Sequence, residues 1–425
     1  MIGFALAAAL SIYDLVEVEL GYTTIADRAY RNASSVTLLD GARSGMLAYL
    51  RSRGVTQPQV GLMRAKPDGR GAVPAIDREI ALAIRRYGAR VEPRPLAYAI
   101  IRGELAALHD PYAVLFTPAE LTSFTKALDG ERFGGIGAVL LADDAARGWR
   151  VDDVFPGSPA EKAGLRGGDL VVAVNATPLA GKPLDAALLR GAIGTTVRLT
   201  VERGGVELAP ITVARAAVSP PDVQSRLLGT VGYVALRGFG PTSGVDVRRA
   251  VAALDARGAT ATVLDLRGNG GGYESQAVRV ASVFIAAGPV VRIEEPRKRR
   301  VENATGGALP ARPLAVLVDR DSASGSELVA AALRDRGLAV LVGARTFGKG
   351  LVQEITPLPD GAALKFTTAR YLPPSGRDLD RVGITPDLEI AQPADAQRSV
   401  PGRDPQLDAA LARLAAPSPA RSAPL

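Results

Sequence analysis

The pattern of apolar and polar residues divides this chain into a helical first part, a β-rich middle and an alternating last part. From Asp14 to Arg53, and from Ile76 to Leu121, apolar residues recur at the spacing of helices. The Gly- and Pro-rich stretch 54–75 between them predicts a loop or an insertion.

The middle of the chain reads as a small β-rich module of about 90 residues. Short β-branched runs bounded by Gly and Pro lie at 133–142, 148–156, 169–175 and 195–204. Two helical pieces are expected between them, at 158–164 and 185–194.

After Leu228, strands and helices are expected to alternate, which predicts an α/β domain with a layered sheet. The expected strands are 232–239, 261–267, 313–319, 338–344 and 363–372, and the expected helices are 243–257, 274–285 and 325–336. The Pro-, Ala- and Ser-rich end, residues 416–425, is predicted to be disordered.

Composition removes several classes of chemistry. The chain has no cysteine, which excludes a Cys nucleophile, a thiolate metal site and a disulfide framework. Its one histidine, His109, excludes metal sites that need two or three imidazoles. The net charge of +7 is modest, and the basic run Arg297–Arg300 is interpreted as a solvated loop rather than a nucleic-acid patch.

The apolar run at residues 1–13 is too short to cross a bilayer but has the length of a signal-peptide core. It lacks the basic residues that precede such a core. An export or anchor segment and an N-terminal helix packed on the body both remain open.

Ser324 lies where a buried apolar strand, 313–319, meets a helix. Such junctions stand at the carboxyl edge of a sheet, and the first N–H groups of the helix could stabilise an oxyanion. Ser324 and Glu327 also form a helix capping box, which this segment alone favours over a nucleophile.

Lys349 lies in a glycine-rich turn, Gly343–Gly350, that superficially resembles a phosphate-binding loop. Gly350 replaces the hydroxyl residue such a loop needs, and the next residues predict a strand instead of a helix. Lysine is rare here, seven among 51 basic residues, and unlike arginine it can lose its proton when desolvated.

The run Gly270-Gly271-Gly272 follows the strand at 261–267. Counted from Gly268, its spacing does not match a dinucleotide-binding fingerprint, because Tyr273 occupies the position of the last glycine. Successive glycines can turn N–H groups toward a ligand, which suits an oxyanion hole, and a tight strand-to-helix turn is the alternative.

Together these segments resemble the carboxyl-terminal processing (tail-specific) protease family of Ser/Lys serine peptidases. The resemblance implies Ser324 as nucleophile, Lys349 as general base and Gln353 as the residue that orients the lysine. It assigns the oxyanion hole to the N–H groups of Gly272 and Gly325, although Gly325 replaces the usual alanine. No metal or cofactor is implied.

The resemblance covers most of the chain and implies a crotonase-like α/β core with an inserted β-rich domain. We expect a helical region at 14–123 with an insertion near 52–98, the inserted domain at 124–215, the core at 216–390, and a C-terminal helix and tail at 391–425.

The module at 124–215 resembles a PDZ domain. The segment Phe133-Gly134-Gly135-Ile136-Gly137 matches its carboxylate-binding loop. A Gly-rich nest can donate N–H groups to a terminal carboxylate while a strand edge pairs with the peptide. Protein or peptide substrates with free C-termini are therefore the expected partners.

The leading interpretation is an endopeptidase that cleaves proteins near their C-termini. The alternative is a catalytically silent PDZ-containing binding or scaffold protein on a peptidase-like core. We further expect an extracytoplasmic location, periplasmic or membrane-anchored through the N-terminus. A homodimer through the terminal helices is an option, and no nucleic-acid partner is expected.

Overall fold

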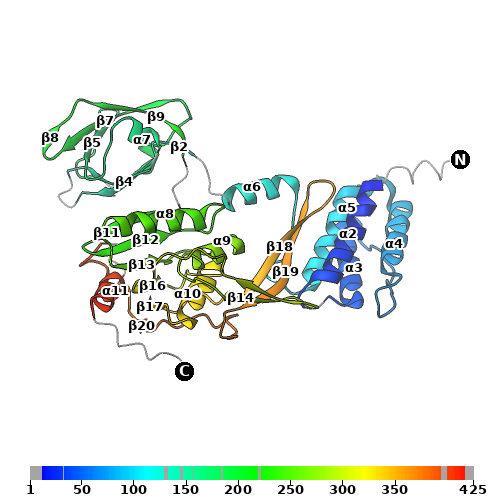
Figure 1. Cartoon of the computed structure of the whole chain (residues 1–425). Helices are drawn as coiled ribbons and strands as arrows, with labels where there is room; N and C mark the ends of the chain where they lie inside the picture. The colour runs from blue at the N-terminus through cyan, green and yellow to red at the C-terminus, as the bar shows by residue number, and fades with distance from the viewer. Residues whose placement is uncertain are drawn as a thin grey trace, which may run out of the picture. The chain divides into compact units, whose positions relative to one another are not determined.

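The computed structural model describes residues 12–31, 33–128, 133–143, 147–155, 157–182, 185–218, 222–393 and 400–416. The chain forms two compact units, one of residues 1–125 with 223–425 and one of residues 126–222 (Figure 1). Residues 1–11 of the apolar run, and residues 417–425 of the tail, lie outside the described residues.

The first unit begins with a helical bundle, as predicted. Its helices are α2 (Ile12–Arg28), α3 (Ser35–Ser52), α4 (Ala72–Tyr87) and α5 (Pro93–Ala107). Leu38, Met46 and Ile100 are fully buried between them. Within the described residues, no helix is long and apolar enough to span a membrane.

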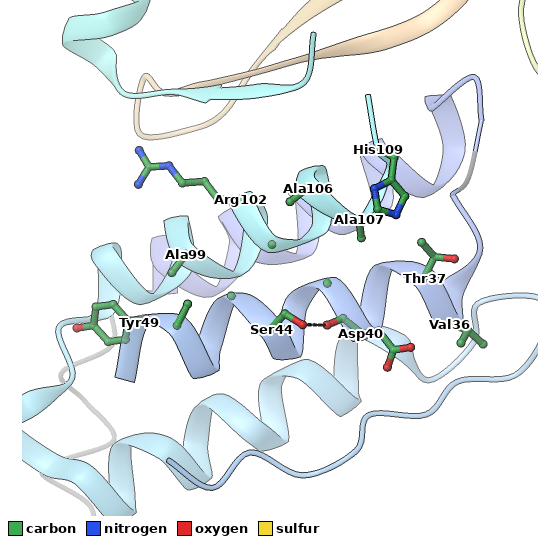
Figure 2. A pocket seen from close by; sticks show the side chains of 14 residues that line it. Val36, Thr37, Asp40, Ser44, Tyr49, Ala99, Arg102, Ala106, Ala107 and His109 are labelled. Carbon is green, nitrogen blue, oxygen red and sulfur yellow. Dashed lines mark hydrogen bonds between the residues drawn. The ribbon is translucent and has the colours of Figure 1, made fainter. Parts of the chain in front are cut away.

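Helices α3 and α5 approach each other at glycines. A Cβ at Gly45 would lie 2.0 Å from the carbonyl oxygen of Ala99, and one at Gly103 would lie 2.2 Å from that of Gly41. Beside this crossing is a groove of about 750 Å³ that His109 also lines (Figure 2).

The same unit contains a six-stranded sheet with the order β11-β12-β13-β16-β17-β20. Its strands are β11 (Val223–Leu228), β12 (Val231–Leu236), β13 (Ala261–Asp265), β16 (Leu314–Val318), β17 (Ala339–Gly343) and β20 (Leu388–Glu389). All neighbours are parallel except β11 with β12. Parallel strands bring their carboxyl ends to one edge, which gathers the loops that follow β13 and β16.

Helices cover both faces of this sheet, so the predicted layered α/β domain is confirmed (Figure 1). One face packs on α8 (Ser243–Ala256), α9 (Glu274–Ala281) and α10 (Gly325–Asp335). The other face packs on α11 (Pro405–Ala415) through Leu407 and Ala410. The finer crotonase-like assignment stays a prediction.

A second, antiparallel sheet lies in the same unit. It contains β1 (Val114–Phe116), β14 (Pro289–Glu294), β15 (Arg299–Asn303), β18 (Leu351–Pro357) and β19 (Ala363–Leu372). The loop interpretation of Arg297–Arg300 is partly wrong, because Arg299 and Arg300 pair with β14 as part of β15. Arg299 forms an ion pair with Glu294, and Arg300 forms one with Glu274, so both positive charges are paired within this unit.

The second unit is the predicted β-rich module. Its main sheet has the order β3-β4-β5-β7-β8, with β6 on β5 and β9 on β7. The strands are β3 (Ala138–Ala142), β4 (Trp149–Val154), β5 (Leu170–Val174), β6 (Thr177–Pro178), β7 (Thr196–Arg203), β8 (Val206–Glu207) and β9 (Ile211–Ala214). Strands β2 (Phe133–Gly135) and β10 (Ala216–Val218) form a separate pair.

One helix predicted in this module is confirmed and the other is wrong. Residues 158–164 contain the short helix α7 (Pro159–Lys162), whose N-cap is Ser158. Residues 185–194 contain only a 3-10 turn, Ala186–Leu188. The side chain of Arg215 fixes this segment as a loop, because it donates to the carbonyl of Leu189 at 2.9 Å.

Candidate active site

Ser324 occupies a strained turn between β16 and α10. Its φ of 54° and ψ of −112° place a non-glycine residue in a region that L side chains rarely adopt. A capping residue usually has extended backbone, so this conformation is unusual for a simple helix cap. Backbone strain of this kind marks a candidate functional residue, and serine nucleophiles on strand-to-helix turns show it.

The other two serines of the segment have structural roles. Ser322 is buried, and its hydroxyl donates to the carbonyl of Leu266 at 2.8 Å. Ser326 is also buried, and its hydroxyl donates to the carbonyl of Asn269 at 2.8 Å. Ser324 is partly exposed, which leaves it as the serine of this segment that a substrate could reach.

The glycine run packs directly against the Ser324 turn. A Cβ at Gly271 would lie 2.8 Å from the Cβ of Ser324 and 3.1 Å from the nitrogen of Gly325. Asn269 holds the two loops together, since its carbonyl accepts from the N–H of Ala323 and its side chain accepts from the N–H of Gly271. The absence of a side chain at Gly271 is therefore a requirement of this contact.

The two predicted oxyanion donors, Gly272 and Gly325, are brought to this junction. Gly325 is the first residue of α10, so its N–H has no acceptor within the helix. Gly272 forms a parallel bridge with Phe239 that uses the carbonyl of Gly271 and the N–H of Tyr273. In such a bridge the N–H of Gly272 points away from Phe239, and among the described residues it has no hydrogen-bond acceptor.

Glu327 connects the serine turn to the lysine turn. One carboxylate oxygen accepts from the backbone N–H groups of Ser324, at 3.0 Å, and Lys349, at 2.8 Å. The other accepts from the hydroxyl of Thr346 at 2.5 Å and the N–H of Gly348 at 2.7 Å. This buried carboxylate therefore links the backbone of Ser324 to the backbone of Lys349.

Tyr371 on β19 makes a second link between the same turns. Its hydroxyl donates to the carbonyl of Ser324 at 2.9 Å and lies within hydrogen-bond distance of the carbonyl of Lys349. Burial raises the pKa of Tyr371, so the hydroxyl stays protonated and able to donate.

The amine of Lys349 is partly buried, and burial is the main cause that lowers its pKa. The positive charge of Lys365 lowers the pKa further, while Glu327 and Asp110 oppose the shift. The Nζ atom lies 4.9 Å from the ring centroid of Tyr112. In the described residues it makes no hydrogen bond to the Ser324 hydroxyl.

Gln353 is placed on β18, four residues beyond Lys349. Its side-chain amide donates to the hydroxyl of Thr367 on β19 at 3.3 Å. No hydrogen bond joins Gln353 to Lys349 among the described residues, so its role as the orienting group stays a prediction.

His109 does not enter this group of residues. Its exposed side chain lines the groove between α3 and α5 together with Thr37 and Ala107 (Figure 2). The next residue, Asp110, faces the active-site sheet, because its carboxylate accepts from the N–H of Thr367 at 2.7 Å.

Several of these contacts could not be read from the sequence. The capping-box spacing pointed to Glu327 but not to its bonds with the lysine turn. The side chains of Asp110, Tyr112, Lys365 and Tyr371 reach the site from segments far away in sequence. Two of them, Asp110 and Tyr112, belong to the short segment His109-Asp110-Pro111-Tyr112.

Comparison with known proteins identifies the family. The model described as "Peptidase family S41" matches residues 230–390, which include both turns. The carboxy-terminal processing protease CtpB of Bacillus subtilis is 32% identical over 76% of this chain and 68% of its own length. This chain belongs to the carboxyl-terminal processing peptidases. The expected serine protease class is thereby confirmed.

Further relatives of this peptidase support the same family. The chloroplastic C-terminal processing peptidase of Tetradesmus obliquus is 34% identical over 71% of this chain and 69% of its own. A protein named "Probable CtpA-like serine protease", from Staphylococcus saprophyticus, is 32% identical over 83% and 71%. A PDZ domain model matches residues 150–203, which confirms that the second unit carries a PDZ domain.

Glu327→Gln should strongly impair the peptidase and also destabilise it. The four donors around Glu327 need acceptors, and an amide replaces one acceptor oxygen with an NH₂ group. Each unsatisfied buried partner costs about 1–3 kcal/mol, and displacement of the base by about 1 Å can cost roughly 100-fold in kcat. The checks are peptide turnover and a thermal melt.

Glu302→Gln on the β14–β15 hairpin is the matched control, since it removes the same charge from the surface. It should leave both kcat and the melting temperature near wild type. Wild-type turnover by a folded Glu327→Gln protein would contradict the positioning role of Glu327.

Proposed function

We propose that this chain is an endopeptidase that cleaves protein substrates near their C-termini through Ser324 and Lys349. In this mechanism the neutral amine of Lys349 takes the Ser324 proton, and the serine oxygen attacks the scissile carbonyl. The N–H groups of Gly272 and Gly325 stabilise the oxyanion, and Gln353 orients the amine. Water then releases the acyl group.

The strongest support for this proposal is the set of hydrogen bonds that Glu327 accepts. A single buried carboxylate, Glu327, holds the backbone of both the strained Ser324 and the lysine whose pKa is lowered. A structural cap would need no such link to a desolvated base. A catalytically silent protein, the alternative, has no need to keep Ser324 in a conformation that costs on the order of 1–3 kcal/mol.

The PDZ domain supports substrate capture by a free C-terminus. Within the described residues, strand β3 lies at an edge of its sheet and pairs with β4, so a peptide could add beside it. The loop Gly134–Gly137 leads into this strand, and Gly137 has a φ of 78° that suits an N–H nest. Phe133, Gly134 and Gly135 also form β2, which pairs with β10.

An amidated peptide should bind the full-length Ser324→Ala protein at least about tenfold more weakly than the same peptide with a free carboxylate. Hydrogen bonds to a charged group contribute about 1.5–3 kcal/mol, and amidation removes that charge. Calorimetry gives both affinities. A peptide altered at an internal residue, with its terminal carboxylate intact, serves as the control. Equal affinity of acid and amide would remove the capture role.

The activity itself is tested with exported proteins as substrates, in keeping with the extracytoplasmic location we propose. Mass spectrometry should find products shortened near the C-terminus, and removal of the last few residues of the substrate should slow their formation. Products cut at random along the chain, or none with any substrate, would contradict a C-terminal processing endopeptidase.

A further inference from the structure

A second lysine, Lys365, lies on the sheet that carries the proposed base. It is on β19, between Val114 of β1 and Ile355 of β18. Side chains two residues apart on a strand share a face, so Lys365 lies on the same face as Thr367. The hydroxyl of Thr367 accepts from Gln353, which places Lys365 on the face of the proposed orienting residue.

The amine of each lysine lies over an aromatic ring, and both rings belong to residues 112–124. The Nζ of Lys349 is 4.9 Å from the ring centroid of Tyr112, and the Nζ of Lys365 is 4.9 Å from that of Phe124. Phe124 is itself held by Phe116, at 4.9 Å between ring centroids. The rings of Tyr112, Phe124 and Phe116 form an apolar cluster that desolvates both amines.

The charges around the two lysines are unequal. Asp110 favours the charged form of each amine, and it is held in place by the N–H groups of Thr367 and Tyr112. Burial lowers the pKa of Lys365, and the charge of Asp110 opposes this shift. The positive charge of Lys365 lowers the pKa of Lys349 in addition to its burial.

The remaining polar groups near Lys349 do not replace this effect. Glu327 favours the charged amine. Asp380 and Arg381 act on Tyr112 with opposite signs, and the phenols of Tyr112 and Tyr371 stay protonated because burial raises their pKa values. Among the described residues, Lys365 forms no ion pair within 4 Å that would cancel its charge.

We propose that Lys365 is a positioning residue of the peptidase reaction, whose cation keeps the amine of Lys349 neutral and able to accept the Ser324 proton. This inference rests on the proposed Ser/Lys mechanism. Its role resembles the general case in which a neighbouring cation activates a catalytic lysine. Lys365 takes no part in bond making and needs only to remain charged.

Replacement of Lys365 by methionine tests this idea, because it keeps the length of the side chain and removes its charge. In wild type, kcat/KM should rise with pH as Lys349 deprotonates. This rise is the acid limb of the pH profile. In Lys365→Met, its apparent pKa should increase by about 0.5–1 pH unit, so activity near pH 7 falls roughly 3–10-fold and recovers at high pH. Lys365→Arg should keep the wild-type profile.

Lys298→Met, on an exposed hairpin, is the matched control for loss of one positive charge and should leave the limb unmoved. An unshifted limb in folded Lys365→Met would overturn the inference, as would an equal shift in Lys365→Arg. If Lys365→Met does not fold, Lys365→Gln provides the same reading.

The outcome also separates this inference from the mechanism on which it rests. An inactive Lys349→Arg with an unshifted Lys365→Met profile rejects the role of Lys365 alone. An active Lys349→Arg rejects the Ser/Lys mechanism and the role of Lys365 with it.

Discussion

Ser324→Ala should reduce peptide hydrolysis by about 10⁴-fold or more while the protein remains folded. The hydroxyl oxygen is the proposed nucleophile, and removal of such an atom leaves only what binding and the oxyanion donors supply. Glu327 still accepts from the backbone N–H of residue 324, so the turn keeps its anchor. The loss in stability should be no more than about 1 kcal/mol. Single-turnover hydrolysis and a denaturant melt measure the two effects.

Ser324→Gly also removes the hydroxyl, but its effect on stability should differ from that of Ser324→Ala. At a φ of 54° glycine is unstrained, whereas serine and alanine are not. The glycine variant should be equally inactive yet more stable than the alanine variant, by on the order of 1 kcal/mol. Substantial hydrolysis by either variant would remove Ser324 from the chemistry. A glycine variant less stable than alanine would show that the turn is not strained.

Several elements of the core could be predicted from local patterns. The strand at 313–319 and the helix at 325–336 follow from a buried apolar run and a helical repeat, and β16 and α10 lie there. The Gly-rich run packs against the Ser324 turn because the two loops follow neighbouring parallel strands, β13 and β16. Local patterns succeed here since each element is decided by its own residues.

Contacts between distant segments could not be predicted in this way. Lys365 reads as one polar position in an ordinary strand, and only the register of β19 with β1 and β18 places it on the face of Gln353. The helix expected at 185–194 failed for a related reason, because Arg215, between β9 and β10, donates hydrogen bonds to carbonyls of that segment. Tertiary hydrogen bonds overrode a local helical pattern.

Lys349→Arg should be folded, able to bind peptide and inactive. Arginine keeps the positive charge and can still lie over the ring of Tyr112, so a structural lysine would tolerate it with a modest loss. A general base would not, because guanidinium stays protonated at any working pH. Removal of a general base costs about 100–10,000-fold, and the loss should approach that of Ser324→Ala because both residues act in one proton transfer.

The pH dependence strengthens this test. Burial and the charge of Lys365 lower the pKa of Lys349, so the wild-type rate should rise with pH and level off below the range of a free lysine. The variant should stay inactive across the whole range, since raising the pH cannot create a neutral guanidinium. Lys298→Arg controls for the exchange itself at an exposed site. Near wild-type cleavage by Lys349→Arg would reject the Ser/Lys mechanism, because a guanidinium group cannot accept the serine proton.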